Sequence, residues 1–205
     1  MSCWMQGNCK GGKHHDKQNR TSRSGSAESV YRSQGLLYSA CVGEHLPAIL
    51  AGIEKLREKG VRIIYAVNEA TGDEFSYDTE VLKRRDPIPM AGTWEAALNA
   101  KVIVRPEDLV LSHYASSAFF GTEMEQYLKD CGIKNVICCG VKTNYNVRAT
   151  ATDAMWYGFR AMLASDMVAC DSEEVNHIHV EELTKYTAKA RPLQEILSRI
   201  EAGAI

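Results

Sequence analysis

The sequence predicts an α/β fold built on a mainly parallel sheet. Two observations predict it: short apolar runs alternate with amphipathic segments, and polar or glycine-rich residues follow the apolar runs. A run that is apolar along its whole length, such as residues 135–141 (NVICCGV), is typical of a strand covered on both faces. This alternation places helices on both faces of a sheet whose working site lies at the carboxyl ends of its strands.

The expected strands and helices follow one another along the chain. Residues 35–42 (GLLYSACV) form a first apolar run, interpreted as a strand, and the next segment shows the 3.6-residue period of a helix that ends at Gly60. Thr122 is placed to cap a short helix, and Gly132 and Gly158 are placed to end two helices. The strands expected after the first are 61–67, 109–113, 135–141 and 160–166, and the helices are 44–60, 121–132, 145–158, 172–190 and 193–203.

Length and charge indicate one soluble domain, residues 36–205, behind a polar tail, residues 1–35. The tail holds six Lys or Arg against Asp16 and Glu28, so its charge is +4, and its lack of apolar periodicity predicts disorder. The whole chain of 205 residues has a net charge of −2, which argues against a nucleic-acid partner. No run approaches the roughly 18 apolar residues of a membrane span, so no membrane partner is expected.

Cysteine usage favours a reducing, cytoplasmic location. The seven cysteines are odd in number, include no CxxC pair and accompany no secretory signal. The Arg/Ser-rich start also fits an organelle transit peptide, which makes mitochondrial targeting a less favoured alternative. Four donors near the start, Cys3, Cys9, His14 and His15, fit no structural zinc pattern, so neither a metal nor another cofactor is expected.

Three segments resemble the isochorismatase-like (cysteine hydrolase) superfamily. Residues 140–159 (GVKTNYNVRATATDAMWYGF) are similar to the family signature, in which a strand ends in Gly-Val-x-Thr-Asn-x-Cys-Val and a helix follows. Residues 116–138 and 91–99 are similar to two further family segments, and the resemblance covers about residues 44–200. It implies a three-layer α/β/α fold with a mainly parallel sheet of about six strands, often assembled into oligomers.

The resemblance also implies a chemistry whose key residues are altered here. Amide hydrolases of the family use an Asp, a Lys and a Cys, with an oxyanion hole of backbone amides that follows a non-proline cis peptide. Asn146 stands at the Cys position and His113 at the Lys position. The Asp position falls near Ala40 if residues 35–42 are the first strand, or at Trp4 in an alternative alignment, and neither alignment supplies an Asp.

The candidate site residues follow from these positions. His113 is either a general acid or cationic pocket group, or a pocket-wall histidine without a proton role. Asn146 is expected to bind a ligand or cap a helix, and Lys142 either supplies charge or points to solvent. The full set comprises the catalytic positions His113 and Asn146, the oxyanion turn Gly140, Val141, Lys142, Thr143, Asn144 and Tyr145, and the pocket wall Tyr114, Ser117 and Phe119.

Two functional interpretations remain open at this point. The first is a hydrolase-like family member with a pocket for a small carbonyl or amide compound, whose hydrolysis is impaired or proceeds through His113 and an ordered water. The alternative is a non-catalytic pseudoenzyme that binds a ligand or assembles into oligomers. Both predict a small-molecule ligand and a homo-oligomer, or a hetero-oligomer with active paralogues. A carboxylate from the tail within hydrogen-bond reach of His113 would favour the first interpretation, and an open pocket with no carboxylate would favour the second.

Overall fold

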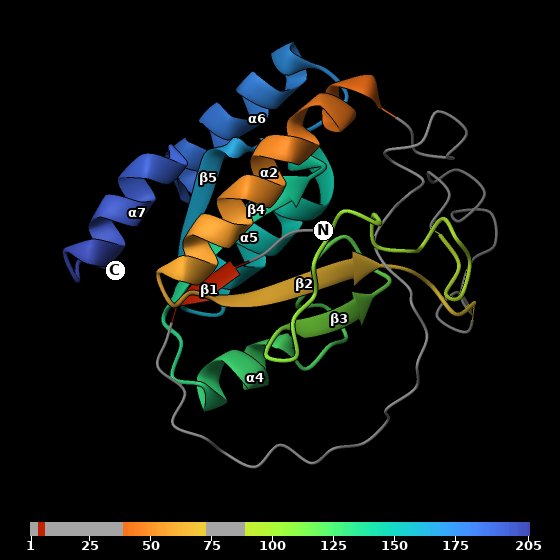
Figure 1. Cartoon of the computed structure of the whole chain (residues 1–205), viewed down its shortest axis with the longest axis horizontal. Coiled ribbons are helices and arrows are strands. Elements are labelled where there is room, and N and C mark those ends of the chain that lie inside the picture. The colour runs from red at the N-terminus through yellow and green to blue at the C-terminus, as the bar shows by residue number, and fades with distance from the viewer. Residues whose placement is uncertain (1–3, 7–38, 73–88) are drawn as a thin grey trace.

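The computed structural model describes residues 4–6, 39–72 and 89–205 (Figure 1). Strands and helices alternate along most of this part of the chain, as the sequence predicts. Their bounds are β1 (Trp4–Gln6), α2 (Ala40–Glu58), β2 (Arg62–Asn68), β3 (Leu109–His113), α4 (Met124–Asp130), β4 (Asn135–Val141), the π-helical turn η2 (Thr143–Val147), α5 (Arg148–Trp156), β5 (Arg160–Ala169), α6 (Glu173–Tyr186), β6 (Lys189–Arg191) and α7 (Leu193–Glu201).

The six strands form one sheet in the order β3-β2-β1-β4-β5-β6. Three strand pairs, β2–β3, β4–β5 and β5–β6, are parallel, whereas β1 runs antiparallel to both of its neighbours. The prediction of a mainly parallel sheet of about six strands is therefore confirmed. Both β3 and β4 begin and end where the sequence pattern places them.

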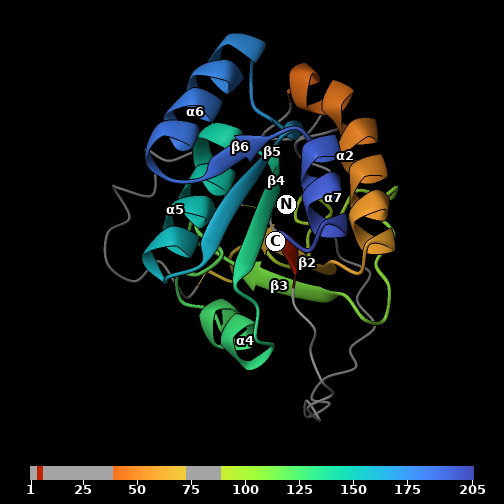
Figure 2. The same ribbon diagram turned by 90° about the vertical axis from the view of Figure 1, so that its left-hand side faces the viewer.

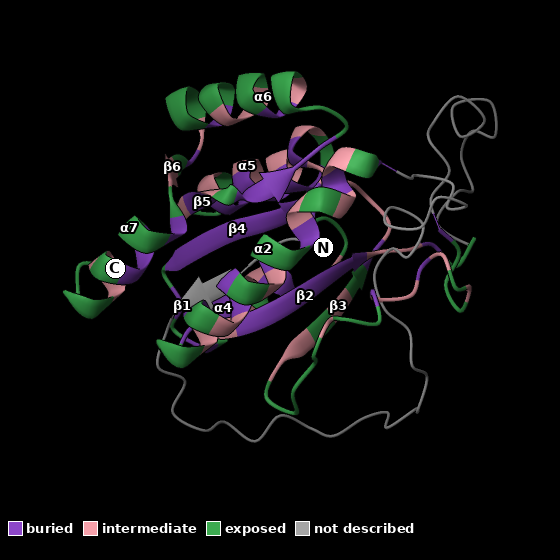
Figure 3. Ribbon diagram, turned by 45° about the horizontal axis from the view of Figure 1, so that its top comes forward, coloured by how far each residue is buried: buried purple, intermediate pink, exposed green. Residues whose placement is uncertain are grey.

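Helices cover both faces of the sheet and complete the predicted three-layer α/β/α architecture. Figure 2 shows α2 and α7 on one side of the strands and α5 and α6 on the other. Strand β4 is buried along its whole length (Figure 3), and its residues alternate between two hydrophobic cores: Ile137 packs with α2 and α7, whereas Val136 packs with α4 and α5. Cys138 and Cys139 consequently face opposite cores.

Helix α2 corrects the predicted first strand. Ser39 caps it by accepting a hydrogen bond from the amide of Val42, so Ala40–Val42, assigned to a strand over 35–42, belong to the helix instead. A short apolar run does not by itself distinguish a strand from a helix, and a serine cap decides it here. Residues 35–38 of that run lie outside the described residues. The predicted helix end is confirmed, because Gly60 has a φ of 76° just beyond α2.

Three residues of the predicted tail form the first strand of the sheet. Trp4–Gln6, within the segment 1–35, form β1 between β2 and β4, whereas the rest of that segment lies outside the described residues. This is the alternative position considered from the sequence. Because β1 is antiparallel, Gln6 at its carboxyl end lies opposite Asn135, the first residue of β4. The end of β1 therefore points away from the edge where β2, β3 and β4 end.

The predicted long helix over 172–190 is divided in two. Helix α6 ends at Tyr186, and residues 189–191 form β6, which pairs with Met162–Ala164 of β5. Pairing with the edge of the sheet outweighs the helical pattern of these residues. Strand β5 also extends beyond its predicted end, to Ala169. Among the described residues, no helix combines the length and the apolar character needed to cross a membrane.

Candidate functional site

The carboxyl ends of β2 and β3 are tied together by hydrogen bonds. Asn68 and His113 are register partners at the ends of these strands. The side-chain amide of Asn68 donates to the carbonyl oxygens of His113 at 3.1 Å and of Ala115 at 2.9 Å. The amide of Glu69 also donates to the His113 carbonyl, at 2.9 Å. These bonds fix the backbone around His113, so its ring has a defined direction.

His113 is a buried, neutral histidine. Its side chain and backbone are only 3% exposed, and Nδ1 lies 2.7 Å from the carbonyl oxygen of Ala115. A carbonyl can only accept, so Nδ1 carries the proton and Nε2 is left as an acceptor. Nε2 is itself buried and has no hydrogen-bond partner among the described residues. Burial lowers the pKa of His113 to about 4, so the ring does not supply the positive charge of a lysine at neutral pH.

The turn after β4 is held in place by hydrogen bonds to α6 and β5. The peptide bond between Val141 and Lys142 is cis, at the place where the family resemblance implies one. Thr143 is fully buried, and its hydroxyl donates to Oδ1 of Asn176 at 2.6 Å. Asn176 in turn donates from Nδ2 to the carbonyl of Val168 at 3.2 Å. This chain anchors η2 to α6 and β5, so Thr143 acts on the position of the turn.

Two backbone amides, that of Tyr145 in the predicted oxyanion turn and that of Val147 just beyond it, form hydrogen bonds within this segment. The carbonyl of Lys142 accepts from the amides of Tyr145 at 3.1 Å and Val147 at 3.2 Å. Gly140, at the end of β4, has a φ of 106°, a conformation that only glycine adopts without strain. The backbone therefore enters the turn through a glycine and then closes on the Lys142 carbonyl.

Lys142 does not extend freely into solvent. Its Nζ lies 2.7 Å from Oδ1 of Asp171, and its side chain is 19% exposed. From the sequence, Lys142 either supplies charge in the turn or points to solvent. The structure shows its ammonium group paired with Asp171, and its role in the turn stays a prediction. Asp171 lies 29 positions after Lys142 in the sequence, so no local sequence pattern predicts this contact.

Asn146 lies inside η2, two residues before α5 begins. It is 7% exposed. Its amide nitrogen is delocalised and its oxygen is weakly nucleophilic, so the side chain cannot perform the covalent step of a cysteine. Its side chain does not cap a helix, because the N-cap of α5 is Val147 and neither η2 nor α5 has a side-chain cap hydrogen bond; a binding role stays a prediction.

A groove of about 620 Å³ brings together four of the predicted site residues. Tyr114 and Ser117 follow β3, and Asn144 and Tyr145 come from η2; all four line the groove. Oδ1 of Asn144 is buried and has no hydrogen-bond partner within the described part of the chain. The structure therefore places two pocket-wall residues and two turn residues in one groove. The two catalytic positions, His113 and Asn146, are buried and do not line it.

Phe119 is corrected from pocket wall to core. It is 3% exposed and stacks on Tyr157, with ring centroids 5.3 Å apart. Phe120, its neighbour, lines the groove instead and contacts Tyr114 edge to face at 6.0 Å. Arg148, absent from the predicted set, also lines the groove. It pairs with Glu182 at 2.7 Å, a contact between α5 and α6 that only the folded chain creates.

One group of metal-compatible side chains lies beside the site. The ligand atoms of Cys41, His45 and Glu173 lie within 4.8 Å of one another, at the amino ends of α2 and α6. Their contacts are those of interhelical pairing: Cys41 Sγ donates to Glu173 at 3.6 Å, and His45 Nε2 lies 3.3 Å from the same carboxylate. Glu173 is 70% exposed. These contacts join the amino-terminal parts of α2 and α6.

The family of this fold is decided by a match over most of the chain. Residues 34–195 match the isochorismatase domain. The chain belongs to the isochorismatase family. A crystal structure of a cysteine hydrolase from Pseudomonas syringae pv. phaseolicola superposes with a TM-score of 0.78 at 17% identity, over 87% of this chain and 90% of that one. At this identity the superposition supports the fold alone.

Curated isochorismatase-family relatives match parts of the chain. An uncharacterised isochorismatase family protein of Escherichia coli is 32% identical over 83 residues, which are 40% of this chain and 44% of that protein. A ureidoacrylate amidohydrolase of Azorhizobium caulinodans is 28% identical over 137 residues, 59% of this chain and 60% of that protein. The chain therefore spans less than two thirds of the length of either relative.

A third relative carries a name that bears on catalysis. It is a "probable inactive nicotinamidase" of Arabidopsis thaliana, 24% identical over 161 residues, 73% of this chain and 80% of that protein. The isochorismatase family thus includes a relative named as inactive. In the present family member, uncharged groups stand at both positions that the resemblance assigns to the cysteine and the lysine, Asn146 and the neutral His113.

Proposed function

We propose that this chain is a family member without cysteine-hydrolase activity that binds a small carbonyl or amide compound in the groove beside η2. The observation that carries the proposal is the environment of His113. Its Nε2 is buried and unpartnered, and no carboxylate of the described residues contacts the ring. A base or a thiol needs a charged partner to be activated, and none of the described residues supplies one there.

The groups around the turn support the same conclusion. Asn146 offers no nucleophile, and the ammonium group of Lys142 is engaged with Asp171. The low pKa of His113, about 4, makes its imidazole a weak base for activating water. A water-based hydrolysis would have to proceed through that weak base, so binding is the better-supported function.

The groove has the chemistry of a small-amide site. Oδ1 of Asn144 is an unpaired acceptor, suited to the N–H of an amide ligand. Tyr114, Phe120 and Tyr145 provide aromatic walls for a flat ligand, and the volume of about 620 Å³ is that of a small-molecule pocket. The relative from Azorhizobium caulinodans is named for an amide substrate, ureidoacrylate, which supports the same ligand class.

The binding test uses calorimetric titration of the full chain with nicotinamide, maleamate and ureidoacrylate. Saturable binding of at least one is expected. Asn144→Leu removes the unpaired acceptor and should weaken that binding about five- to tenfold. Gln194→Leu removes an exposed amide on α7 and serves as the matched control, with unchanged binding. No saturation by any of the compounds, or equal binding by Asn144→Leu, would contradict the proposed site.

The catalytic test measures ammonia release from the same amides. The wild-type chain is expected to give none above background. Release that is abolished by His113→Ala would overturn the non-hydrolytic proposal and establish the water-based route through His113. Release that survives both His113→Ala and Asn146→Ala would overturn it as well, and would place the chemistry elsewhere.

A further inference from the structure

Cationic side chains gather at the amino edge of the sheet, opposite the groove. Arg160 begins β5, and Lys189 and Arg191 lie in β6. The register pairs Met162 with Lys189 and Ala164 with Arg191. Directly paired residues share a face of a sheet, and so do residues two apart on one strand. Arg160, Lys189 and Arg191 therefore all project from the face that also carries Met162.

That face is the one covered by α7. Met162 packs in the core that contains Ile196 and Leu197 of α7. Arg199, on the same helix, joins the three cations of the sheet, and its Nε is buried without a hydrogen-bond partner in the described chain. A guanidinium that is partly withdrawn from water and lacks an acceptor is unfavourable unless another group satisfies it.

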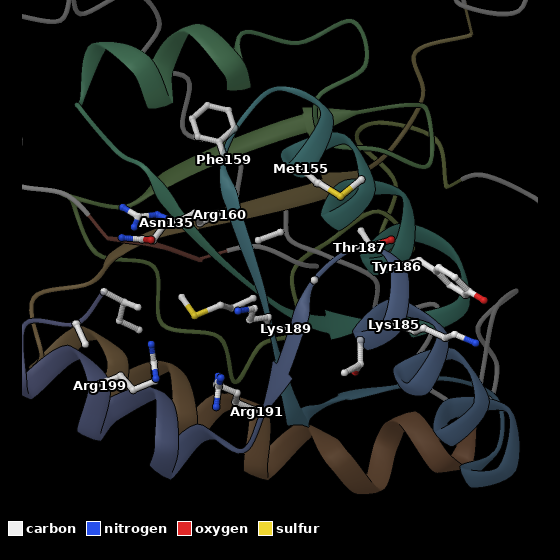
Figure 4. Close-up of a pocket in the computed structure, with 16 residues that line it drawn as sticks. Asn135, Met155, Phe159, Arg160, Lys185, Tyr186, Thr187, Lys189, Arg191 and Arg199 are labelled. Carbon is white, nitrogen blue, oxygen red and sulfur yellow. The ribbon is translucent and has the colours of Figure 1, made fainter.

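These four cations line one cavity of about 540 Å³, shown in Figure 4, together with a fifth, Lys185 of α6, whose Nζ lies 5.1 Å from the centroid of the Tyr186 ring. Figure 4 shows that Arg160 comes from β5, Lys189 and Arg191 from β6, and Arg199 from α7. No acidic side chain of the described residues lines the cavity. Arg191 forms an ion pair with Glu195, which leaves Arg160, Lys189 and Arg199 without an acidic partner among the described ranges.

The arrangement is complementary to a multiply charged anion. Several like charges around one cavity repel one another and raise the local concentration of counter-ions. Three of the four are arginines, whose planar forks bind phosphate oxygens in pairs. Arg191 and Arg199 are half-buried, whereas Arg160 and Lys189 are exposed, so the cavity is open to a ligand at its mouth.

We infer that this cavity binds the phosphate group of a small molecule. The inference is independent of the proposed groove ligand, because the two sites lie at opposite edges of the sheet and share no lining residue. The ligand carries at least two negative charges, to match the three cations without an acidic partner.

Calorimetric titration of the full chain at 150 mM chloride tests the wild-type site. The probes are inorganic phosphate, diphosphate and adenosine diphosphate, so free phosphate and a phosphate ester are distinguished. Saturable binding that tightens from phosphate to diphosphate is expected for a multiply charged site. Tighter binding of adenosine diphosphate than of diphosphate would identify a phosphate ester as the ligand. An absence of saturable binding for all three probes would overturn the inference.

Charge-removal variants locate the binding. Arg160→Gln with Arg199→Gln should weaken diphosphate binding at least about tenfold, since charge-assisted hydrogen bonds to the anion are lost. The matched control, Lys55→Gln with Lys101→Gln, removes two exposed charges outside the cavity and should bind as the wild type does. Equal weakening in both would mean a general charge effect and would overturn the site.

If the double variant fails to fold, Arg199→Lys provides a second test of the site. It retains the charge and loses the planar fork, so diphosphate binding should weaken severalfold while the melting temperature without ligand stays near the wild-type value. Unchanged diphosphate affinity in Arg199→Lys and in Arg160→Gln tested alone would place the anion elsewhere and contradict the inference.

Discussion

Nδ1 of His113 lies 2.7 Å from the carbonyl oxygen of Ala115, two residues along the chain. This single contact fixes the tautomer of a buried imidazole and turns its other nitrogen into an unpaired acceptor. The lysine expected here from the family resemblance would carry a charge, whereas this ring carries none at neutral pH. The difference between the two states is measurable as a dependence of stability on pH.

His113 should make the chain less stable in mild acid. Its pKa is lowered by burial to about 4, against an unfolded value near 6.5, so the unfolded chain binds the proton more readily. Stability is therefore complete above about pH 6.5 and falls as pH decreases to about 4, by about 3 kcal/mol in all. Urea unfolding at pH 7.5, 6 and 5 would measure this loss.

The matched variant for this experiment is His113→Phe, which fills the site without a titrating group. It loses the bond to Ala115 and should be less stable at pH 7.5, yet its stability should change less than that of the wild type between pH 6.5 and 5. An identical pH profile for both proteins would show that another group controls acid unfolding.

The buried hydrogen bond of Thr143 should contribute to the stability of the turn. Thr143→Val keeps the shape of the side chain but leaves Oδ1 of Asn176 without its donor, at a cost of about 1–3 kcal/mol. The control is Thr184→Val on the exposed side of α6, where the hydroxyl donates to the carbonyl of Val180. Denaturant unfolding should find the control within about 0.5 kcal/mol of the wild type. Equal losses in both would remove the special role of Thr143.

Two glycines of α2 should respond to alanine with opposite signs. A Cβ on Gly52 would lie 2.5 Å from Cε of Met167, a buried side chain of β5, so Gly52→Ala should destabilise by about 1–2 kcal/mol. Nothing lies within 4 Å of a Cβ on Gly43, so Gly43→Ala should stabilise by about 0.5–1 kcal/mol through helix propensity. Thermal unfolding of the two variants gives the comparison. A stabilised Gly52→Ala would mean that Met167 repacks without cost.

The sequence predicts best where one physical pattern dominates. Strand β4 lies where its apolar run places it, because a strand between two helical layers has no polar face to confuse the pattern. The stop after α4 follows from Gly132, whose φ is 65°. The turn residues Thr143 and Asn146 were located by the resemblance of residues 140–159 to the family signature.

Contacts between distant segments could not be foreseen in the same way. The direction of β1 depends on its pairing with β2 and β4, and no property of three residues encodes it. The pairing of Lys142 with Asp171 depends on how η2 and the end of β5 are brought together. Residues 189–191 carry a helical pattern, but they pair with the open edge of β5 and form a strand.

Restoring the family's charged residue should therefore fail without a carboxylate. In Asn146→Cys with His113→Lys, the lysine enters a site that is 3% exposed and has no acidic partner among the described residues. Burial lowers the pKa of such a lysine, so the folded state should lose at least about 3 kcal/mol at pH 7.

The sign of the pH dependence distinguishes the cost of burying the lysine charge from a poor steric fit of the lysine side chain. The lysine has a lower pKa in the folded chain than in the unfolded chain, so its destabilisation should lessen as pH rises toward the unfolded value near 10.4. Urea unfolding at pH 7 and 9.5 tests this, with Asn146→Cys alone as the control, which should not show this gain with pH. A double variant as stable as its control at pH 7, and able to release ammonia from an amide, would mean that a carboxylate reaches His113 from residues beyond those described.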